Sequence, residues 1–139
     1  MNTFTFADIQ KGMSESFSRE ITDAMEAAFR EISGDENLLH KDDAYAEQIG
    51  GYRQHVTFGM LTASLYSTIA GMYLPGKYSL IHSIEIKFIK PVFAGDVLTV
   101  TGTVDEKHEN MKLLRLKVKI VNQTDECVSK ADMKVLVLK

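Results

Sequence analysis

Apolar and polar residues alternate along most of the second half of the chain. The alternation has a period of two over residues 84–88, 98–104 and 114–120, and a last apolar series occupies positions 133, 135 and 137. Strands with one buried face have this spacing. Because the four segments follow one another at short intervals, they predict an antiparallel sheet.

The first half of the chain has mainly helical spacing. A weak alternation over residues 15–21 predicts a first strand. Thr22 or Asp23 can then cap a helix over residues 24–32, where apolar residues recur at helical intervals. Gly34 follows, and glycine is the residue that most readily takes the left-handed conformation at a helix end.

Two more helices are predicted before the sheet. Asp42 can cap a short one that stops at Gly50-Gly51. Residues 59–74 are apolar nearly all round, which is typical of a helix buried on most sides, and Pro75-Gly76 ends this helix. The sheet needs a cover for its apolar face, and this helix is the candidate. The predicted fold is therefore α+β: an antiparallel sheet wrapped around one long central helix, the hot-dog architecture.

Composition narrows the class of protein. The chain has 139 residues, 45% hydrophobic and 25% charged, which indicates one soluble globular domain over residues 1–139. Its net charge of −3 argues against nucleic acid as a partner. Residues 1–11 lack the basic and apolar regions of a signal peptide, and residues 59–74 are too short to span a membrane. A single cysteine, Cys127, cannot form an internal disulfide, so we expect a cytoplasmic protein.

Residues 33–42, between the first two helices, carry the first candidate chemistry. Asp35, Asn37 and His40 lie within six residues of one another. A carboxylate and an imidazole that face one cleft can hold a water molecule and move its protons in both directions. A capped turn between two helices has the same composition, and this segment alone does not separate the two interpretations.

Gly59 is the second candidate, because it begins the long apolar helix. The first backbone N–H groups of a helix have no partner within the helix. A glycine there lets a substrate carbonyl approach closely, and the free N–H and the helix dipole can polarise that carbonyl. Glycine is also tolerated at a helix start without any such role.

Together the two segments resemble the R-specific enoyl-CoA hydratases of the MaoC-like dehydratase family, which has the hot-dog fold. The family signature is Asp-x-Asn-Pro-x-His-x-Asp, then a Tyr/Phe-Ala pair, His-Gly-Met-Leu, and a serine eight residues after that glycine. The similarity extends over about residues 14–138. The matching positions are Asp35, Asn37, His40, Asp42, Tyr45-Ala46, Gly59-Met60-Leu61, Ser67, Leu74-Pro75-Gly76, Phe88, Lys90-Pro91-Val92-Phe93 and Gly95-Asp96.

The resemblance implies the reversible syn hydration of a trans-2-enoyl thioester to the (3R)-3-hydroxyacyl thioester. Asp35 and His40 would be the catalytic dyad that holds and activates water. The Gly59 N–H would stabilise the enolate-like oxygen. Ser67 would bond and orient the catalytic loop, and Asn37 would shape that loop. No metal or other cofactor is implied, and the acyl group would be carried by coenzyme A or by acyl carrier protein.

The chain departs from the family signature at two positions. Leu38 replaces the usual proline, which we expect to loosen the loop, and Phe58 replaces the histidine before Gly59. Because of these departures, a non-catalytic acyl-thioester-binding domain is the second hypothesis. A hot-dog acyl-CoA thioesterase is a third hypothesis. It would need a carboxylate on or near the central helix, and residues 59–74 contain no Asp or Glu.

Other polar residues are assigned to the surface. We expect His55 to lie in a polar loop without a catalytic role. We expect Arg115, Lys117 and Lys119 to form a solvated basic face of a strand, with the phosphates of coenzyme A as an alternative partner. A single copy leaves the edges of its sheet open, so the sequence predicts at least a homodimer.

Overall fold

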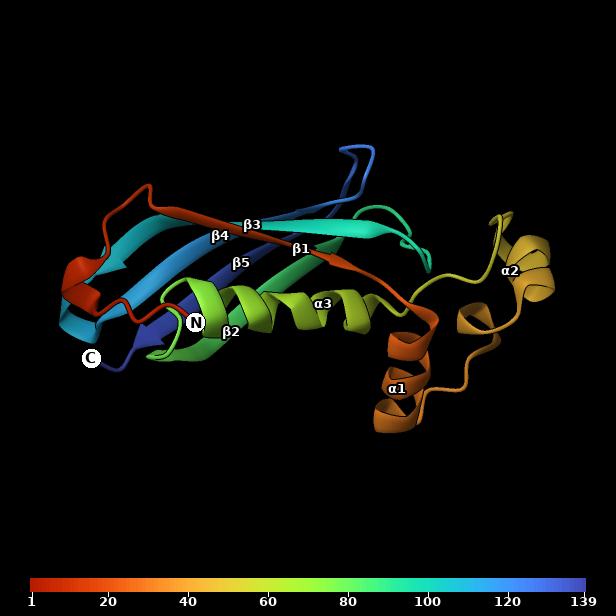
Figure 1. The fold of residues 1–139 in the computed structure, drawn as a ribbon, viewed down its shortest axis with the longest axis horizontal. Coiled ribbons are helices and arrows are strands. Elements are labelled where there is room, and N and C mark those ends of the chain that lie inside the picture. The colour runs from red at the N-terminus through yellow and green to blue at the C-terminus, as the bar shows by residue number, and fades with distance from the viewer.

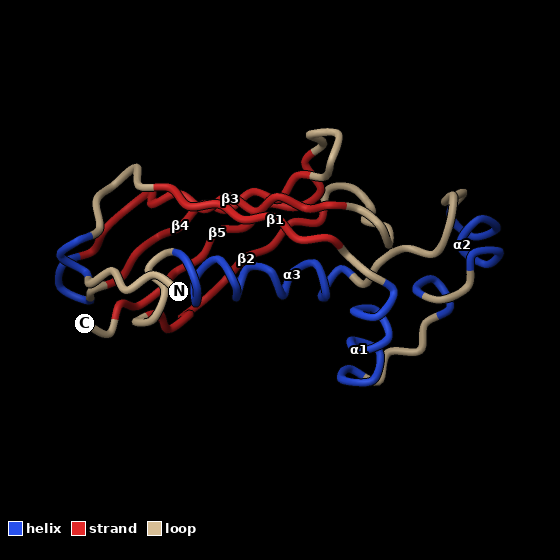
Figure 2. Tube along the Cα trace, in the orientation of Figure 1, coloured by secondary structure: helices blue, strands red, loops and turns tan.

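The computed structural model describes all of residues 1–139. One antiparallel sheet is covered on one face by a helix, and two further helices lie beyond the N-terminal end of that helix (Figures 1 and 2). The elements in chain order are β1 (Ser14–Glu20), α1 (Asp23–Ser33), α2 (Asp43–Gly50), α3 (Gly59–Thr68), β2 (Ser79–Phe88), β3 (Val97–His108), β4 (Leu113–Val121) and β5 (Cys127–Val137).

The sheet has the strand order β1-β3-β4-β5-β2, and every neighbouring pair is antiparallel. All the strands expected from the alternation are confirmed, the weakly patterned first one included. Strands that follow one another in the sequence are not always neighbours in the sheet. β2 does not pair with β3 but with β5, where Ile86 lies opposite Ala131. As a result β2 forms one edge of the sheet and β1 forms the other.

The core lies between α3 and the sheet. Its largest fully buried side chain is Tyr66, which is 1% exposed and whose hydroxyl lies 2.6 Å from Oγ of Ser129 on β5. Burial raises the pKa of Tyr66 to about 12, so the hydroxyl stays protonated. Ile69 packs against β3 at Gly102, where a Cβ atom would come within 2.9 Å of Ile69 Cγ1. The sheet thus wraps closely around a central helix, and the predicted hot-dog fold is confirmed.

The two short helices begin and end as their sequences predict. The Thr22 side chain caps α1, and Gly34 ends it in the left-handed conformation with a φ of 71°. The Asp42 side chain caps α2, and Gly51 ends it with a φ of 69°. These caps determine where the chain leaves each helix, and so they position the segment between α1 and α2.

The central helix ends differently from the prediction. Regular α-helix stops at Thr68, and a π-helical turn over Ile69–Tyr73 continues it. The N–H of Leu74 bonds to the carbonyl of Ile69 at 2.8 Å, which adds one residue to the last turn. The apolar pattern is too uniform here to distinguish the two helix types. Even with this extension, no helix is long and hydrophobic enough to cross a membrane.

Candidate active site

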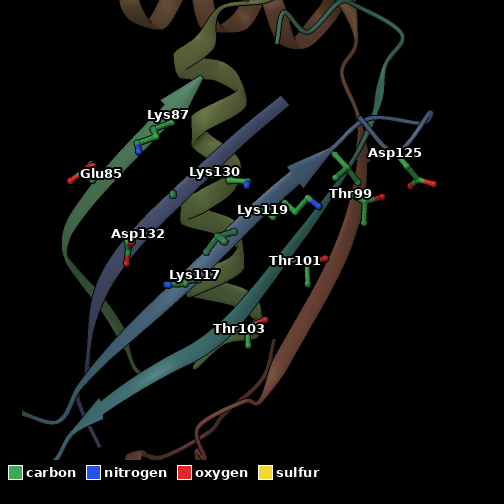
Figure 3. A pocket seen from close by; sticks show the side chains of 13 residues that line it. Glu85, Lys87, Thr99, Thr101, Thr103, Lys117, Lys119, Asp125, Lys130 and Asp132 are labelled. Atoms are coloured by element: carbon green, nitrogen blue, oxygen red, sulfur yellow. The ribbon is translucent and has the colours of Figure 1, made fainter. Parts of the chain in front are cut away.

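A groove of about 860 Å³ lies on the face of the sheet that points away from α3 (Figure 3). Lys87, Lys130 and Lys119 lie side by side in it on β2, β5 and β4. Arg115, on the same face, bonds to Asp132 at 2.7 Å. None of the predicted catalytic residues lines this groove. The candidate chemistry therefore lies elsewhere.

A smaller cavity of about 300 Å³ lies at the beginning of α3. Two of the predicted site residues, His40 and Gly59, line it together. Most of the remaining wall is formed by Phe88 at the end of β2, residues 89–92 and Val128 of β5. A largely apolar cavity with a few polar groups at one end is typical of a small-molecule site.

His40 is held in this wall by three contacts. Its Nδ1 lies 2.7 Å from the carbonyl oxygen of Val56. Its ring centroid lies 4.3 Å from that of Phe58, and its own carbonyl accepts a hydrogen bond of 3.2 Å from Arg30. A carbonyl can only accept, so Nδ1 carries the hydrogen and Nε2 of the neutral ring has the free lone pair. The contacts therefore leave Nε2 as the ring nitrogen without a hydrogen-bond partner in the structure.

The packing of Phe58 explains why this residue can replace the histidine of the family signature. The side chain is 1% exposed and packs against the ring of Phe29 at 5.0 Å between centroids. The guanidinium of Arg30 lies 5.7 Å from the Phe58 ring. An aromatic ring at this position thus forms a rigid support for the imidazole of His40, where the family signature has a polar side chain.

Gly59 is the first residue of α3, as predicted, and Phe58 is its N-cap residue. The Gly59 N–H has no hydrogen-bond acceptor in the structure. A Cβ atom at this position would lie 3.2 Å from the ring of Phe88, so a side chain would crowd the cavity wall. The position thus combines a free donor with close access for a ligand, as an oxyanion site requires.

Asp35 lies in the exposed loop after α1, where side chains bond to the backbone in succession. The N–H of Asp35 donates to Ser33, Oδ1 of Asp35 accepts the N–H of Asn37 at 3.0 Å, and Oδ1 of Asn37 accepts the N–H of Leu39 at 2.9 Å. These bonds hold the loop at the position where Leu38 replaces proline. No hydrogen bond joins Asp35 to His40 in this single copy, and the dyad stays a prediction.

Ser67 lies on an exposed side of α3. The structure gives it no side-chain hydrogen bond, either to the loop around Asp35 or to any other group. The single chain therefore brings His40 and Gly59 together in one cavity and leaves Ser67 and Asp35 outside its wall.

One polar cluster was missed by the sequence analysis. Glu26 of α1 is 3% exposed, and its carboxylate lies 2.8 Å from Nε2 of His55 and accepts the hydroxyl of Thr57 at 2.6 Å. Nδ1 of His55 lies 2.6 Å from Asp43 of α2. The side chain of His55, expected at the surface, is only 20% exposed and connects both helices. Its partners are far away in the sequence, so no local pattern indicated the cluster.

The buried hydroxyl of Thr62 leads to a prediction about the free energy of unfolding. It is 2% exposed, and its hydroxyl has no hydrogen-bond partner. A buried hydroxyl without a partner costs about 1–3 kcal/mol. Replacing Thr62 with valine, which has nearly the same shape, should raise the free energy of unfolding by about 1 kcal/mol. Urea denaturation measures this difference. The control Thr62→Ser keeps the hydroxyl and should gain nothing, and an unchanged or lower stability of Thr62→Val would contradict the prediction.

The chain is similar in sequence to known proteins. The family model described as "MaoC like domain" matches residues 5–127. The (R)-specific enoyl-CoA hydratase of Aeromonas caviae is 34% identical over 115 residues, which cover 83% of this chain and 85% of the relative. The 3-hydroxybutyryl-CoA dehydratase of Methylorubrum extorquens is 31% identical over 111 residues, 80% of this chain and 70% of the relative.

Solved structures agree with the sequence relatives. The R-hydratase PhaJ1 of Pseudomonas aeruginosa, in its unliganded form, superposes with a TM-score of 0.90 at 26% identity and covers 99% of this chain and 87% of its own. The (R)-hydratase of A. caviae has a TM-score of 0.87 at 31% identity, with 93% and 97% coverage. The match over residues 5–127, the identities above 30% and the shared fold all lead to one assignment. This chain is a member of the MaoC-like dehydratase family.

Proposed function

We propose that this enzyme catalyses the reversible syn hydration of trans-2-enoyl thioesters to (3R)-3-hydroxyacyl thioesters. The observation that carries the proposal is the cavity at the start of α3, where His40 and the free N–H of Gly59 lie in one wall. The names of the two curated relatives support it, because one denotes hydration of an enoyl-CoA and the other dehydration of a 3-hydroxyacyl-CoA.

The proposed reaction uses a carboxylate, an imidazole and a backbone N–H. Asp35 and Nε2 of His40 hold a water molecule, and one of them removes its proton as the water oxygen bonds to C3 of the enoyl group. The electrons of the double bond move toward the thioester carbonyl, whose oxygen accepts a hydrogen bond from the Gly59 N–H. The dyad then returns the proton taken from the water to C2 on the same face, so both groups end in the protonation state in which they began. Dehydration follows the same steps in reverse.

The dyad requires the carboxylate of Asp35 to turn toward the water molecule that His40 holds. Its only hydrogen bond, from the N–H of Asn37, uses Oδ1 and leaves Oδ2 free. We assign Asn37 to shaping the loop, because its side chain caps the turn that begins at Leu38. Ser67 would orient this loop once the site is fully assembled.

We further propose that the active species is a homodimer, or a larger homo-oligomer, joined along β2. This strand is an edge of the sheet, so one row of its backbone N–H and carbonyl groups is unpaired. Ile84 and Phe88 are on its helix-side face, opposite Met133 and Ser129 of β5, and are 39% and 53% exposed. A second copy would cover this apolar strip. It would also cover the exposed Phe88 wall of the cavity.

The substrate carrier in this proposal is coenzyme A or acyl carrier protein, with no metal or other cofactor. The relatives named for CoA substrates support the first carrier. The free thiol of Cys127 is compatible with the cytoplasm, where we place the reaction.

The test is to add crotonyl-CoA to the purified protein and follow the loss of enoyl thioester absorbance. A series of longer enoyl-CoA substrates defines the acyl preference, and chiral analysis of the product should give the 3R isomer. A protein that is inert toward every chain length would contradict the proposal. Release of free thiol from acyl-CoA would instead indicate a thioesterase, and tight binding without turnover would indicate a binding domain.

A further inference from the structure

The cluster around His55 connects three segments of the chain. Glu26 and Asp23 come from α1, Asp43 comes from α2, and His55 lies in the segment that enters α3. The carboxylate of Glu26 uses one oxygen for Nε2 of His55 and the other for the hydroxyl of Thr57. Asp43 accepts both the backbone N–H of His55 at 2.8 Å and its Nδ1 at 2.6 Å. No other histidine of the chain has both ring nitrogens at carboxylates.

This geometry requires a particular protonation state. Ionised carboxylates only accept hydrogen bonds, so both ring nitrogens of His55 must donate, which only the imidazolium can do. Burial lowers the pKa of His55, but the hydrogen bonds with Asp43 and Glu26 outweigh burial, and the net pKa lies above the ordinary value. The backbone and ring N–H groups of His55 in turn hold the pKa of Asp43 below its usual range. The imidazolium therefore persists to higher pH than that of an unperturbed histidine, and it is lost as the pH rises through the raised pKa.

The residue next to His55 is the one that orients His40. The N–H of Val56 donates to the carbonyl of Leu39 at 2.9 Å, and the carbonyl of Val56 lies 2.7 Å from Nδ1 of His40. On the other side, the hydroxyl of Thr57 bonds to Glu26. Residues 55–57 are thus fixed to the helices at each end, and their middle carbonyl determines which nitrogen of His40 carries the hydrogen.

We infer that His55 is a positioning residue for the reaction: its imidazolium, clamped between Glu26 and Asp43, holds the Val56 carbonyl in place and so selects the Nδ1–H tautomer of His40. The inference rests on the proposed role of His40. When His55 loses its proton, one ring nitrogen presents a lone pair to a carboxylate, and the clamp opens. His40 then samples both tautomers, and the fraction with Nε2 free to act as a base falls.

The experiment compares the pH profiles of crotonyl-CoA hydration for wild type and for His55→Gln. Wild type should lose kcat in one proton-dependent step as the pH rises through the raised pKa of His55. His55→Gln should lack that step, and on the acidic side of the step its kcat should be about 10-fold below wild type with little change in KM, because misplacing a catalytic group costs rate more than binding. Asp43→Asn and Glu26→Gln should keep the step and move it to lower pH, because each removes one charge that stabilises the imidazolium. Asp43 is largely exposed, so that variant is expected to fold normally.

A second readout does not depend on turnover. The nitrogen chemical shifts of the His40 ring report its tautomer in the free protein. The Nδ1–H form should dominate in wild type, and both tautomers should be populated in His55→Gln. The control is His108→Gln, which removes a distant histidine that lies 3.1 Å from Glu106, and it should change neither readout. If His55→Gln keeps the wild-type pH profile and the wild-type His40 tautomer, the inference is overturned. An inactive wild type would instead refute the proposed function, and the tautomer measurement would still decide the role of His55.

Discussion

Substituting His40 with alanine should lower kcat for hydration of crotonyl-CoA by about 10²–10⁴-fold, the usual contribution of a positioned proton-transfer group. The carbonyl of Val56 fixes the tautomer of this imidazole, and the ring of Phe58 supports its face. Both contacts serve to orient Nε2 rather than to bind substrate. KM should therefore change much less than kcat. Steady-state kinetics across the pH range, with the melting temperature of each variant, provide the measurement.

Asp35→Asn is the companion variant. It keeps the oxygen that accepts the N–H of Asn37, so the loop should keep its conformation while the carboxylate of the dyad is lost. We expect a loss of at least about 100-fold in kcat. The effects of Asp35→Asn and His40→Ala should not add in the double variant, because both residues act on one water molecule. His108→Ala serves as the control and should retain full activity. Retention of more than a tenth of the wild-type kcat by either site variant would exclude that residue from the proton transfer.

Local patterns predicted the elements of this fold because each pattern has a local physical cause. Thr22 and Asp42 cap helices through side chains that accept the N–H groups three residues further along the chain. The alternation in β3 to β5 follows from one face packing on α3. The position of Gly59 at the start of α3 was predicted for the same reason, since a helix start depends on adjacent residues.

Contacts between residues far apart in the sequence could not be predicted from local patterns. The pairing of β2 with β5 leaves Ile84 and Phe88 exposed at an edge, although their alternation is the same as that of buried strands. The contact between Glu26 and His55 joins α1 to the segment before α3, and neither residue has an unusual local context. The place of Phe58 against His40 also depends on tertiary packing, so the departure from the family signature could be noticed in the sequence but not interpreted.

Ile84→Lys should convert the protein into monomers and reduce kcat by about 100-fold or more. Ile84 is 39% exposed in the single copy, on the helix-side face of the edge strand. If two copies pair along β2, this side chain becomes buried, and a lysine there would place an unpaired charge in the interface at a cost of about 3–5 kcal/mol. Light scattering after size-exclusion chromatography gives the mass of the particle, and the hydration assay gives kcat on the same fractions.

The loss of activity is expected because one copy does not assemble all the proposed catalytic groups. Asp35 and Ser67 are exposed and lie outside the cavity wall, and Phe88, which forms part of that wall, is 53% exposed. The matched control is Ile32→Lys, because Ile32 is 83% exposed and belongs to α1, a helix outside the sheet (Figure 1). It should leave both mass and kcat unchanged. A monomeric Ile84→Lys with wild-type kcat would show that a single copy completes the site by moving the loop of Asp35 alone. A wild type with the mass of one subunit would refute the interface itself.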